Sequence, residues 1–137
     1  MTVKPTMRIL VADDDPLMRT FVAITMTDVA EVVEAADGTE ALQRLQDGER
    51  FDLLLLDWDM PGTNGLEVLK TMRRQGCEVP VFMVTAKNER VDVLQAIHAG
   101  ASDYLIKPFD SDALHRKVSK VCPAMPQQTL CSPRGVS

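Results

Sequence analysis

Apolar residues in this chain fall into short continuous blocks, separated by longer segments in which they recur at helical spacing. The five blocks are 9–12, 31–36, 53–56, 79–84 and 103–106. Continuous apolar runs of this length are typical of strands that are covered on both faces, as in a parallel sheet. The block at 31–36 is the most polar of the five, which predicts an edge strand.

A segment with helix signals follows each block. The residues predicted to cap these helices are Asp15, Asp37, Asn88 and Asp110, and a further helix is predicted over 65–75. In the first helix, Leu17, Phe21 and Ile24 recur at helical spacing. Strands and helices that alternate in this way predict a parallel sheet with right-handed crossovers.

Five strands and five helices predict one α/β domain with three layers, α/β/α. We place this domain at residues 7–122, after a short N-terminal extension at 1–6 and before a C-terminal tail at 123–137. The tail has three prolines and no apolar period. It is predicted to be disordered, or docked only loosely.

Composition and charge narrow the classes of function. The chain has 137 residues and a formal net charge of −5, so a direct nucleic-acid binder is not expected. No apolar stretch approaches the ~18 residues that span a bilayer, and the N-terminus has no signal-peptide pattern. The three cysteines are widely spaced, so neither a disulfide framework nor a zinc site is expected. These features together predict a cytoplasmic protein without a membrane partner.

Polar side chains stand at the carboxyl ends of four of the predicted strands. They are Asp13 and Asp14 after the first block, Asp57 after the third, Thr85 after the fourth and Lys107 after the fifth. Ligands of open α/β sheets bind in the crevice outside the carboxyl ends of the strands. We therefore expect these five side chains to gather at one edge of the sheet.

The three carboxylates of this set are candidate metal ligands. Placed within a few ångströms of one another, they would repel and would take up protons or bind a cation. Carboxylate oxygens and water suit Mg²⁺, and Mn²⁺ also fits. An acidic turn after a strand is by itself often only a solvated loop. The coincidence with Thr85 and Lys107 favours a metal site.

Asp57 is the candidate nucleophile. An aspartate is ionised at neutral pH without a helper base, and its carboxylate can attack a phosphoryl group to form an aspartyl phosphate. The transferred group needs positioning and positive charge more than acid–base chemistry. Lys107 can hold one phosphoryl oxygen, while the Thr85 hydroxyl and a backbone N–H near Ala86 can hold another.

Five short motifs occur together in the chain: Asp13-Asp14, Asp57–Gly62, Thr85-Ala86, Ala99–Ala101 and Lys107–Phe109. In this order and spacing, they resemble the receiver domain of two-component response regulators over about residues 7–121. In style the chain is similar to stand-alone, chemotaxis-type regulators. The resemblance implies a flavodoxin-like fold with strand order 2-1-3-4-5.

The resemblance also implies a role for each of the acidic residues. Asp57 would be the phosphoacceptor, loaded from a histidine kinase. Asp14 and Asp57 would ligate Mg²⁺ directly, together with the backbone carbonyl of Asp59. Asp13 would act through a bound water.

The remaining implied roles concern the phosphoryl group and the output. Thr85 and Lys107 would bind phosphoryl oxygens, and Tyr104 would be an aromatic switch that turns inward when Thr85 moves toward the phosphate. The Lys107–Pro108 bond is expected to be cis. The output face would comprise the fourth helix, fifth strand and fifth helix, roughly residues 88–121.

Two charged residues lie beside the expected site. Asp59 follows the phosphoacceptor by two positions, and Lys87 follows Thr85 by two. One hypothesis is that they pair across the site entrance and tune the lifetime of the phosphate. The alternative is a pair of solvated side chains, because exposed ion pairs contribute only ~0–1 kcal/mol.

Three other functions compete with the receiver interpretation. The segment Asp57-Trp58-Asp59 imitates the nucleophile motif of haloacid-dehalogenase-like phosphatases, although that class places its acidic metal pair after the lysine. A flavin binder is disfavoured, because the acidic turn after the first strand would repel a flavin phosphate. A non-phosphorylated interaction module would keep only the fold.

We therefore expect a phosphorylation-activated signalling switch, not an enzyme with independent turnover. Its expected partners are a histidine kinase or phosphotransfer protein and a separate output protein. It would be a monomer or a phosphorylation-dependent dimer. The chain would be either a natural stand-alone regulator or a receiver excised from a longer one.

Overall fold

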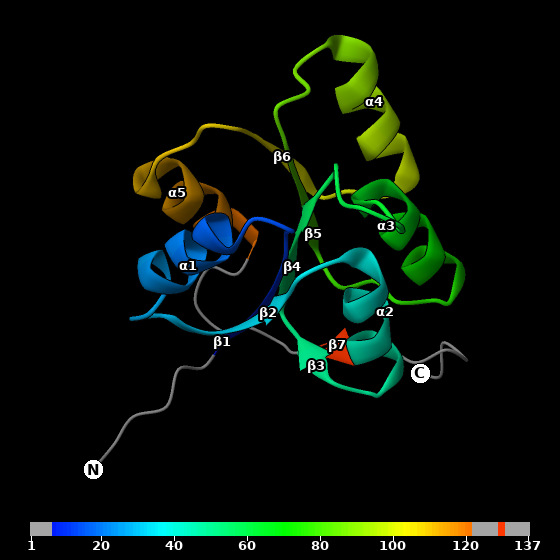
Figure 1. Ribbon diagram of the computed structural model, residues 1–137, viewed down its shortest axis with the longest axis horizontal. Helices are drawn as coiled ribbons and strands as arrows, with labels where there is room; N and C mark the ends of the chain where they lie inside the picture. Colours follow the sequence, from blue (N-terminus) through cyan, green and yellow to red (C-terminus); the bar gives the residue numbers. More distant parts are fainter. Residues whose placement is uncertain (1–6, 122–128, 131–137) are drawn as a thin grey trace.

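A computed structural model describes residues 7–121 and 129–130. Its centre is a five-stranded sheet in the order β2-β1-β4-β5-β6, and all neighbouring strands in it are parallel (Figure 1). The strands are β1 (Met7–Ala12), β2 (Ala30–Ala35), β4 (Leu53–Asp57), β5 (Val81–Thr85) and β6 (Asp103–Ile106). Because β4, β5 and β6 are the third, fourth and fifth predicted strands, the predicted order 2-1-3-4-5 is confirmed.

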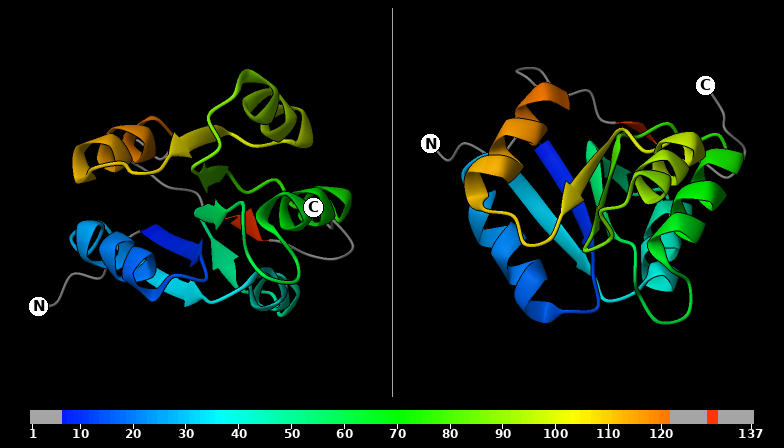
Figure 2. Two further views of the ribbon diagram at one scale, coloured as in Figure 1. Left: turned by 45° about the horizontal axis from the view of Figure 1, so that its top comes forward. Right: turned by 90° about the horizontal axis from the view of Figure 1, so that it is seen from above.

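Helices cover both faces of this sheet. They are α1 (Pro16–Thr25), α2 (Gly38–Gln46), α3 (Gly65–Arg74), α4 (Arg90–Ala99) and α5 (Ser111–Val121). Helices α1 and α5 lie on one face, and α2, α3 and α4 lie on the other (Figure 2). The predicted three-layer α/β/α architecture is confirmed.

The core follows from the alternation of side chains along the central strands. Leu54 and Leu56 of β4 pack with the helices α2, α3 and α4, whereas Leu53 and Leu55 pack with α1 and α5. All residues of β4 and β5 are buried, which accounts for their continuous apolar sequences. Strand β2 lies at one edge and is buried only at its two ends, as its polar sequence predicts.

Side-chain caps begin three of the helices as the sequence predicts. Asp15 accepts a hydrogen bond from Leu17 N at 2.9 Å, Asp37 from Glu40 N at 2.8 Å and Asp110 from Ala113 N at 2.8 Å. In α4 the prediction is wrong. Its N-cap is Glu89, not Asn88, and Glu89 makes no capping side-chain bond. The start of α4 therefore lacks a stabilising interaction that is typically worth about 1 kcal/mol.

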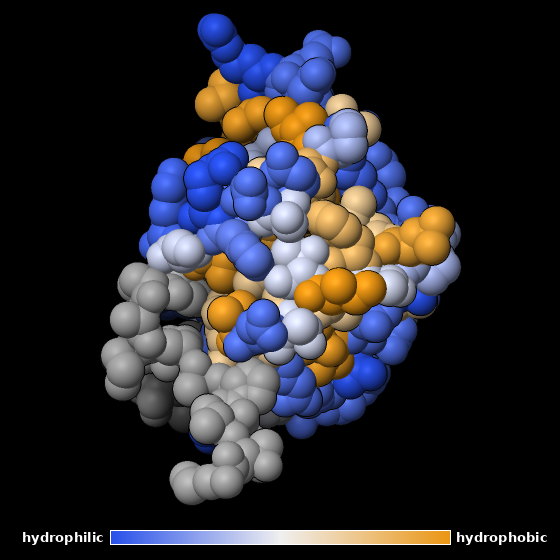
Figure 3. All heavy atoms as spheres, turned by 90° about the vertical axis from the view of Figure 1, so that its left-hand side faces the viewer, coloured by the Kyte–Doolittle hydropathy of each residue, from blue (hydrophilic) through white to orange (hydrophobic). Residues whose placement is uncertain are grey.

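Helix α1 faces the sheet with only part of the apolar stripe that its sequence suggests, because Phe21 packs partly buried against the core. Val22 is the buried residue of α1 and Met26, directly after the helix, is buried too, whereas Leu17 is 77% and Ile24 is 68% exposed. Leu17 and Ile24 therefore lie on the side of α1 that faces away from the sheet. Apolar side chains consequently appear on the face that carries α1 and α5 (Figure 3).

A second, small sheet was not predicted. Strand β3 (Arg50–Phe51) pairs antiparallel with β7 (Thr129–Leu130), beside the amino end of β4 (Figure 1). The N-terminal extension at 1–6 lies outside the described residues. So does the predicted tail, apart from 129–130. At 129–130 the chain pairs with β3.

The cysteine prediction is wrong at one position. Cys77, which follows α3, is disulfide-bonded. The sequence holds two further cysteines, Cys122 and Cys131, both outside the described residues. In the described part of the chain, no helix has the length and apolar content to cross a bilayer.

Candidate functional site

The sheet topology brings the five predicted site residues to one edge. Asp13 and Asp14 directly follow β1, Asp57 and Thr85 are the last residues of β4 and β5, and Lys107 directly follows β6. Backbone bonds hold these strand ends together. Trp58 N donates to Val84 O at 2.9 Å, and Lys107 N donates to Thr85 O at 2.8 Å. The predicted convergence at the carboxyl edge is therefore present.

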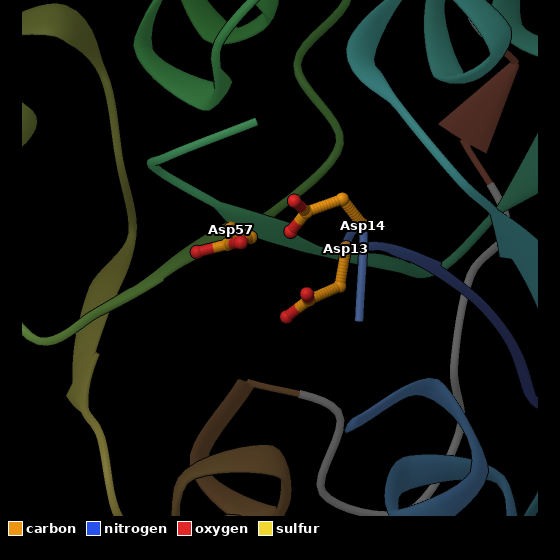
Figure 4. Close-up of side chains that lie close together, drawn as sticks. All are labelled: Asp13, Asp14 and Asp57. Carbon is orange, nitrogen blue, oxygen red and sulfur yellow. The ribbon is translucent and has the colours of Figure 1, made fainter. Parts of the chain in front are cut away.

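Three carboxylates meet at the centre of this edge. One carboxylate oxygen from each of Asp13, Asp14 and Asp57 lies within 4.8 Å of the others. Their side chains point toward a common space (Figure 4). Asp13 and Asp57 are only 2% and 5% exposed, whereas Asp14 is exposed to solvent. The cluster thus has two buried carboxylates and one on the solvent side.

Lys107 supplies the positive charge of the site. Its Nζ lies 3.0 Å from Asp13 Oδ2 and 3.3 Å from Asp57 Oδ1, so the ammonium bridges the two buried carboxylates. One ammonium does not balance three carboxylates. The excess negative charge is the electrostatic condition for binding a divalent cation.

Burial and this excess of negative charge both affect the protonation equilibria of the site. Burial, and then the charge of Asp13, raise the pKa of the Asp57 carboxyl from its ordinary value of 3.8 to about 7, although Lys107 opposes this shift. Burial opposes the charged form of Lys107. The hydrogen bond to Asp13 and the charges of Asp57 and Asp13 outweigh that effect and raise the pKa of Lys107.

The loop that carries the acidic pair is held by contacts that the sequence did not indicate. Asp15 N donates to Asp13 Oδ1 at 2.8 Å, and Arg19 Nη1 of α1 donates to the Asp13 carbonyl at 2.7 Å. Arg19 Nε also pairs with Glu34 Oε1 at 3.0 Å. The sequence pattern did not identify Arg19 as a site residue, because a basic residue one turn after a helix cap is also common on solvent-facing helix surfaces.

The backbone of Asp57 is fixed from the opposite side by α3. Gly65, the first residue of α3, donates its N–H to Trp58 O at 3.0 Å. A Cβ at Gly65 would lie 2.3 Å from the carbonyl oxygen of Asp57. Only glycine allows the helix to begin this close to the strand end.

Thr85 is linked to Tyr104 through the backbone of Lys87. Lys87 N donates to Thr85 Oγ1 at 3.1 Å, and the Tyr104 hydroxyl donates to Lys87 O at 2.5 Å. Tyr104 is 8% exposed and packs edge-to-face against Trp58. Burial raises the pKa of Tyr104, and the charges of Asp92 and Asp59 raise it further. The hydroxyl and the aromatic residue predicted to act together are thus connected.

The remaining predicted site residues lie around this centre. Lys87 Nζ is 3.9 Å from Asp59 Oδ1 and 5.9 Å from the centre of the Trp58 ring, so the predicted charge pair is present. Both partners are largely exposed. Ala86 is exposed directly after β5, and the Lys107–Pro108 bond is cis as expected.

The donor set fits Mg²⁺. Carboxylate oxygens, one of them solvent-facing, leave room for the water molecules that Mg²⁺ retains, and the described residues of the cluster include no thiolate or imidazole. Together, the fold and this pocket define the class of the protein. It is a doubly wound α/β domain with an acidic cluster, bridged by a lysine, at the carboxyl edge of its sheet.

The chain belongs to the response regulator receiver domain family, whose sequence profile matches residues 9–119. Receiver domains are phosphorylation-activated signalling switches. This assignment favours the expected two-component function over the phosphatase and flavin-binding alternatives.

Curated relatives and solved structures agree with the family. The chain is 38% identical to "Chemotaxis protein CheY" of Pseudomonas aeruginosa over 119 residues, which cover 84% of this chain and 95% of that protein. It is 37% identical to "Chemotaxis protein CheY-3" of Vibrio cholerae, over 84% of this chain and 91% of that protein. The Francisella response regulator 1452 receiver domain superposes with a TM-score of 0.79 at 31% identity, covering 84% of this chain and 95% of that one.

Proposed function

We propose that Asp57 is the phosphoacceptor of this receiver domain and that Lys107 neutralises the incoming group. The observation that carries the proposal is the bridge from Lys107 Nζ to Asp13 and Asp57, at 3.0 and 3.3 Å, in a buried acidic cluster. A lysine held between two carboxylates has little structural reason to be there, because a buried charge network costs desolvation energy. Reactive sites are where such arrangements concentrate.

In the proposed reaction, a carboxylate oxygen of Asp57 attacks phosphorus, and the bond from phosphorus to the donor's leaving atom breaks. Asp13, Asp14, Asp57 and the backbone carbonyl of Asp59 would hold Mg²⁺. When bound, the metal supplies positive charge against the phosphoryl oxygens. These ligands come from the ends of β1 and β4, which the sheet holds rigidly.

Three groups of the chain would hold the transferred phosphoryl group. Lys107 would bind one oxygen as a point charge, and the Thr85 hydroxyl with the backbone N–H of Ala86 would bind another. Thr85 now accepts a bond from Lys87 N at 3.1 Å. A hydroxyl that turned toward a phosphate would weaken this contact and shift Lys87, whose carbonyl holds Tyr104.

Tyr104 would carry this change to an output face made of α4, β6 and α5. The described surface of that face exposes Val91, Leu94 and Ile97 of α4 and Ile106 of β6, which are 65%, 59%, 46% and 41% exposed. Apolar side chains grouped on a surface commonly mark a protein interface. Phosphorylation would bias the face between two conformations, which a separate output protein distinguishes.

The proposed partners follow from this mechanism. A histidine kinase or phosphotransfer protein would load Asp57, and the protein would catalyse its own phosphorylation and dephosphorylation without turning over other substrates. The relatives named for chemotaxis make a motility-related output protein the first candidate. We propose a cytoplasmic location, with no direct binding of nucleic acid or membrane. The protein would be a monomer or a phosphorylation-dependent dimer.

The metal and phosphoryl parts of the proposal are tested through Trp58, the only tryptophan of the chain. It directly follows Asp57 and contacts the Tyr104 ring. Its fluorescence should change on addition of Mg²⁺ and change again when beryllofluoride is added as a phosphate mimic. The Asp57→Asn variant should lose the second change. A wild type that responds to neither addition would contradict the proposal.

The output face is tested by affinity capture with and without beryllofluoride. Leu94→Asp on α4 should abolish the capture of any beryllofluoride-dependent partner, because it places a charge in the exposed apolar group. Leu17→Asp is the matched control, since Leu17 is 77% exposed on α1, on the other side of the sheet. Equal loss in both variants would argue against a specific role for α4.

The charge pair at the entrance is expected to prolong the aspartyl phosphate. Asp59→Asn removes the partner that lies 3.9 Å from Lys87 Nζ and allows water to approach the site more easily. Because an exposed pair contributes at most ~1 kcal/mol, the phosphate half-life should shorten by about two- to fivefold. Lys87→Met should act in the same direction. Unchanged half-lives would leave the two side chains with no role beyond solvation.

A further inference from the structure

The three carboxylates of the acidic cluster are not held equally firmly. Asp13 is fixed at both oxygens, because Asp15 N donates to Oδ1 at 2.8 Å and Lys107 Nζ lies 3.0 Å from Oδ2. Asp57 is the last residue of β4, and Lys107 Nζ lies 3.3 Å from its Oδ1. Within the described residues, no hydrogen bond or ion pair holds the exposed carboxylate of Asp14. Asp14 nevertheless points into the cluster (Figure 4), so its position depends on the backbone that carries it.

That backbone is a short link between β1 and α1. Strand β1 ends at Ala12 and helix α1 begins at Pro16, so Asp14 belongs to neither element. One contact with the sheet reaches the link, because Asp13 N donates to Ala35 O at 3.1 Å. Beyond this contact the chain has left the sheet, and each residue keeps two soft backbone dihedrals. The direction in which Asp14 projects therefore requires a further restraint.

Arg19 supplies a restraint at the peptide that joins Asp13 to Asp14. Its Nη1 donates to the Asp13 carbonyl oxygen at 2.7 Å. Because this carbonyl and the following N–H share one plane, the bond also fixes the direction in which the chain enters Asp14. Hydrogen bonds from a charged donor are roughly twice as strong as neutral ones. The guanidinium thus holds the backbone of a side chain that has no anchor of its own.

Arg19 is itself anchored on two sides. Its backbone N–H donates to Asp15 O at 3.2 Å in the first turn of α1, and its Nε donates to Glu34 Oε1 of β2 at 3.0 Å. Its side chain is only 18% exposed. The planar guanidinium presents its N–H groups in a fixed fork, which suits two partners at once. The Glu34 carboxylate largely balances its charge, so Arg19 adds little net positive charge beside the cluster.

We propose that Arg19 is a positioning residue for the metal site, an inference that rests on the proposed function because it requires a cation in the acidic cluster. Through the Asp13 carbonyl, Arg19 holds Asp14 in the place from which it binds Mg²⁺. Groups that orient metal ligands from behind typically contribute about 10- to 100-fold to metal affinity. Arg19 orients one ligand through the backbone, so the lower end of that range is expected.

Mg²⁺ titration of Arg19→Met, at constant ionic strength, tests the proposal. The dissociation constant, followed through Trp58 fluorescence and by calorimetry, should rise about tenfold relative to wild type. Arg19→Gln, which is shorter and uncharged, should give the same rise. The matched control is Arg44→Met, because Arg44 is also a helix arginine in ion pairs, with Glu40 and Glu49, toward the end of α2 that precedes β3. Its Mg²⁺ affinity should equal that of wild type.

A double-mutant cycle shows whether Arg19 acts through Asp14. Asp14→Asn alone should weaken Mg²⁺ binding, and adding Arg19→Met should weaken it by less than about twofold further, because the two residues work as one unit. An arginine that affected the site through general stability or through its charge would keep its full effect in both backgrounds.

Amide hydrogen exchange gives a second readout that needs no metal. In metal-free protein, Arg19→Met should speed exchange at the Asp15 amide, which donates to Asp13 Oδ1 in the same link. The amide of Val22, on the buried face of α1, should stay protected. Protection at Val22 also verifies that the variant has folded, so a weaker Mg²⁺ affinity cannot be attributed to unfolding.

The outcomes separate this proposal from the proposed function. Unchanged or tighter Mg²⁺ binding in Arg19→Met and Arg19→Gln would overturn the role of Arg19 alone. A full tenfold effect of Arg19→Met in the Asp14→Asn background would overturn it as well. A wild type that binds no Mg²⁺ would instead overturn the proposed metal site, and the role of Arg19 with it.

Discussion

The Asp57→Asn variant is expected to take up no phosphoryl group from acetyl phosphate and Mg²⁺ under conditions that label the wild type. The side-chain amide has a similar shape but lacks the carboxylate that attacks phosphorus. Lys107 keeps its second partner, because Asp13 Oδ2 lies 3.0 Å from its Nζ. The variant should therefore fold with the rest of the pocket in place, which makes the loss of labelling a chemical effect.

Intact-mass spectrometry measures the result, with Asp59→Asn as the matched control. That substitution makes the same chemical change two residues away, at a side chain that is 66% exposed, and should still be labelled, with only the two- to fivefold shorter phosphate half-life expected above. Asp13 and Asp14 are the nearest competing carboxylates. Labelling that persisted in Asp57→Asn would move the phosphoacceptor to one of them and overturn the proposed function.

A second large effect is expected in the pH dependence of stability without metal. Burial and the charge of Asp13 raise the pKa of the Asp57 carboxyl from its ordinary value of 3.8, which applies to the unfolded chain, to about 7 in the folded protein. Between these values the folded state holds a proton that the unfolded state has lost, so stability falls as pH rises from about 4 to about 7. The upper bound of this loss is about 4 kcal/mol, since one pKa unit corresponds to about 1.4 kcal/mol. Asp57→Asn cannot titrate and avoids the loss.

Urea unfolding in EDTA, followed through Trp58 fluorescence, checks this expectation. The variant should be more stable than the wild type at pH 8, and the difference should shrink toward pH 5. Mg²⁺ should reduce or reverse the difference at pH 8, because it stabilises only the folded protein that binds it. Asp59→Asn should show no such pH-dependent difference. A gap between wild type and Asp57→Asn that is constant with pH would contradict a raised pKa.

The sheet and the site were predictable from sequence because a local pattern, an apolar run followed by a polar residue, recurs at each strand. Continuous apolar runs identify β4 and β5, whose residues are all buried. In a parallel sheet, the residue after each run must lie at the same edge, so the positions of Asp57 and Thr85 follow from strand identity alone. The proximity of Lys107 to Asp13, 94 positions apart in sequence, follows from the same geometry.

The features that sequence reasoning missed depend on tertiary contacts. Several apolar residues of α1 compete for its inward face, and packing selects Val22, followed by Met26 directly after the helix. Asn88 has a good capping side chain, but the chain turns one residue later, at Glu89. The β3–β7 pair has two residues in each strand, which is too short to leave a periodic pattern in the sequence.

The Gly65 contact has a consequence for engineering this domain. A side chain at position 65 would have to push α3 away from the strand that carries the phosphoacceptor, because its Cβ would sit 2.3 Å from the Asp57 carbonyl oxygen. Even alanine at this position would therefore displace both α3 and the loop that joins β4 to α3. For grafted sensors or fused reporters, insertions are best kept out of the 57–65 segment, where this close approach leaves no room for added side chains.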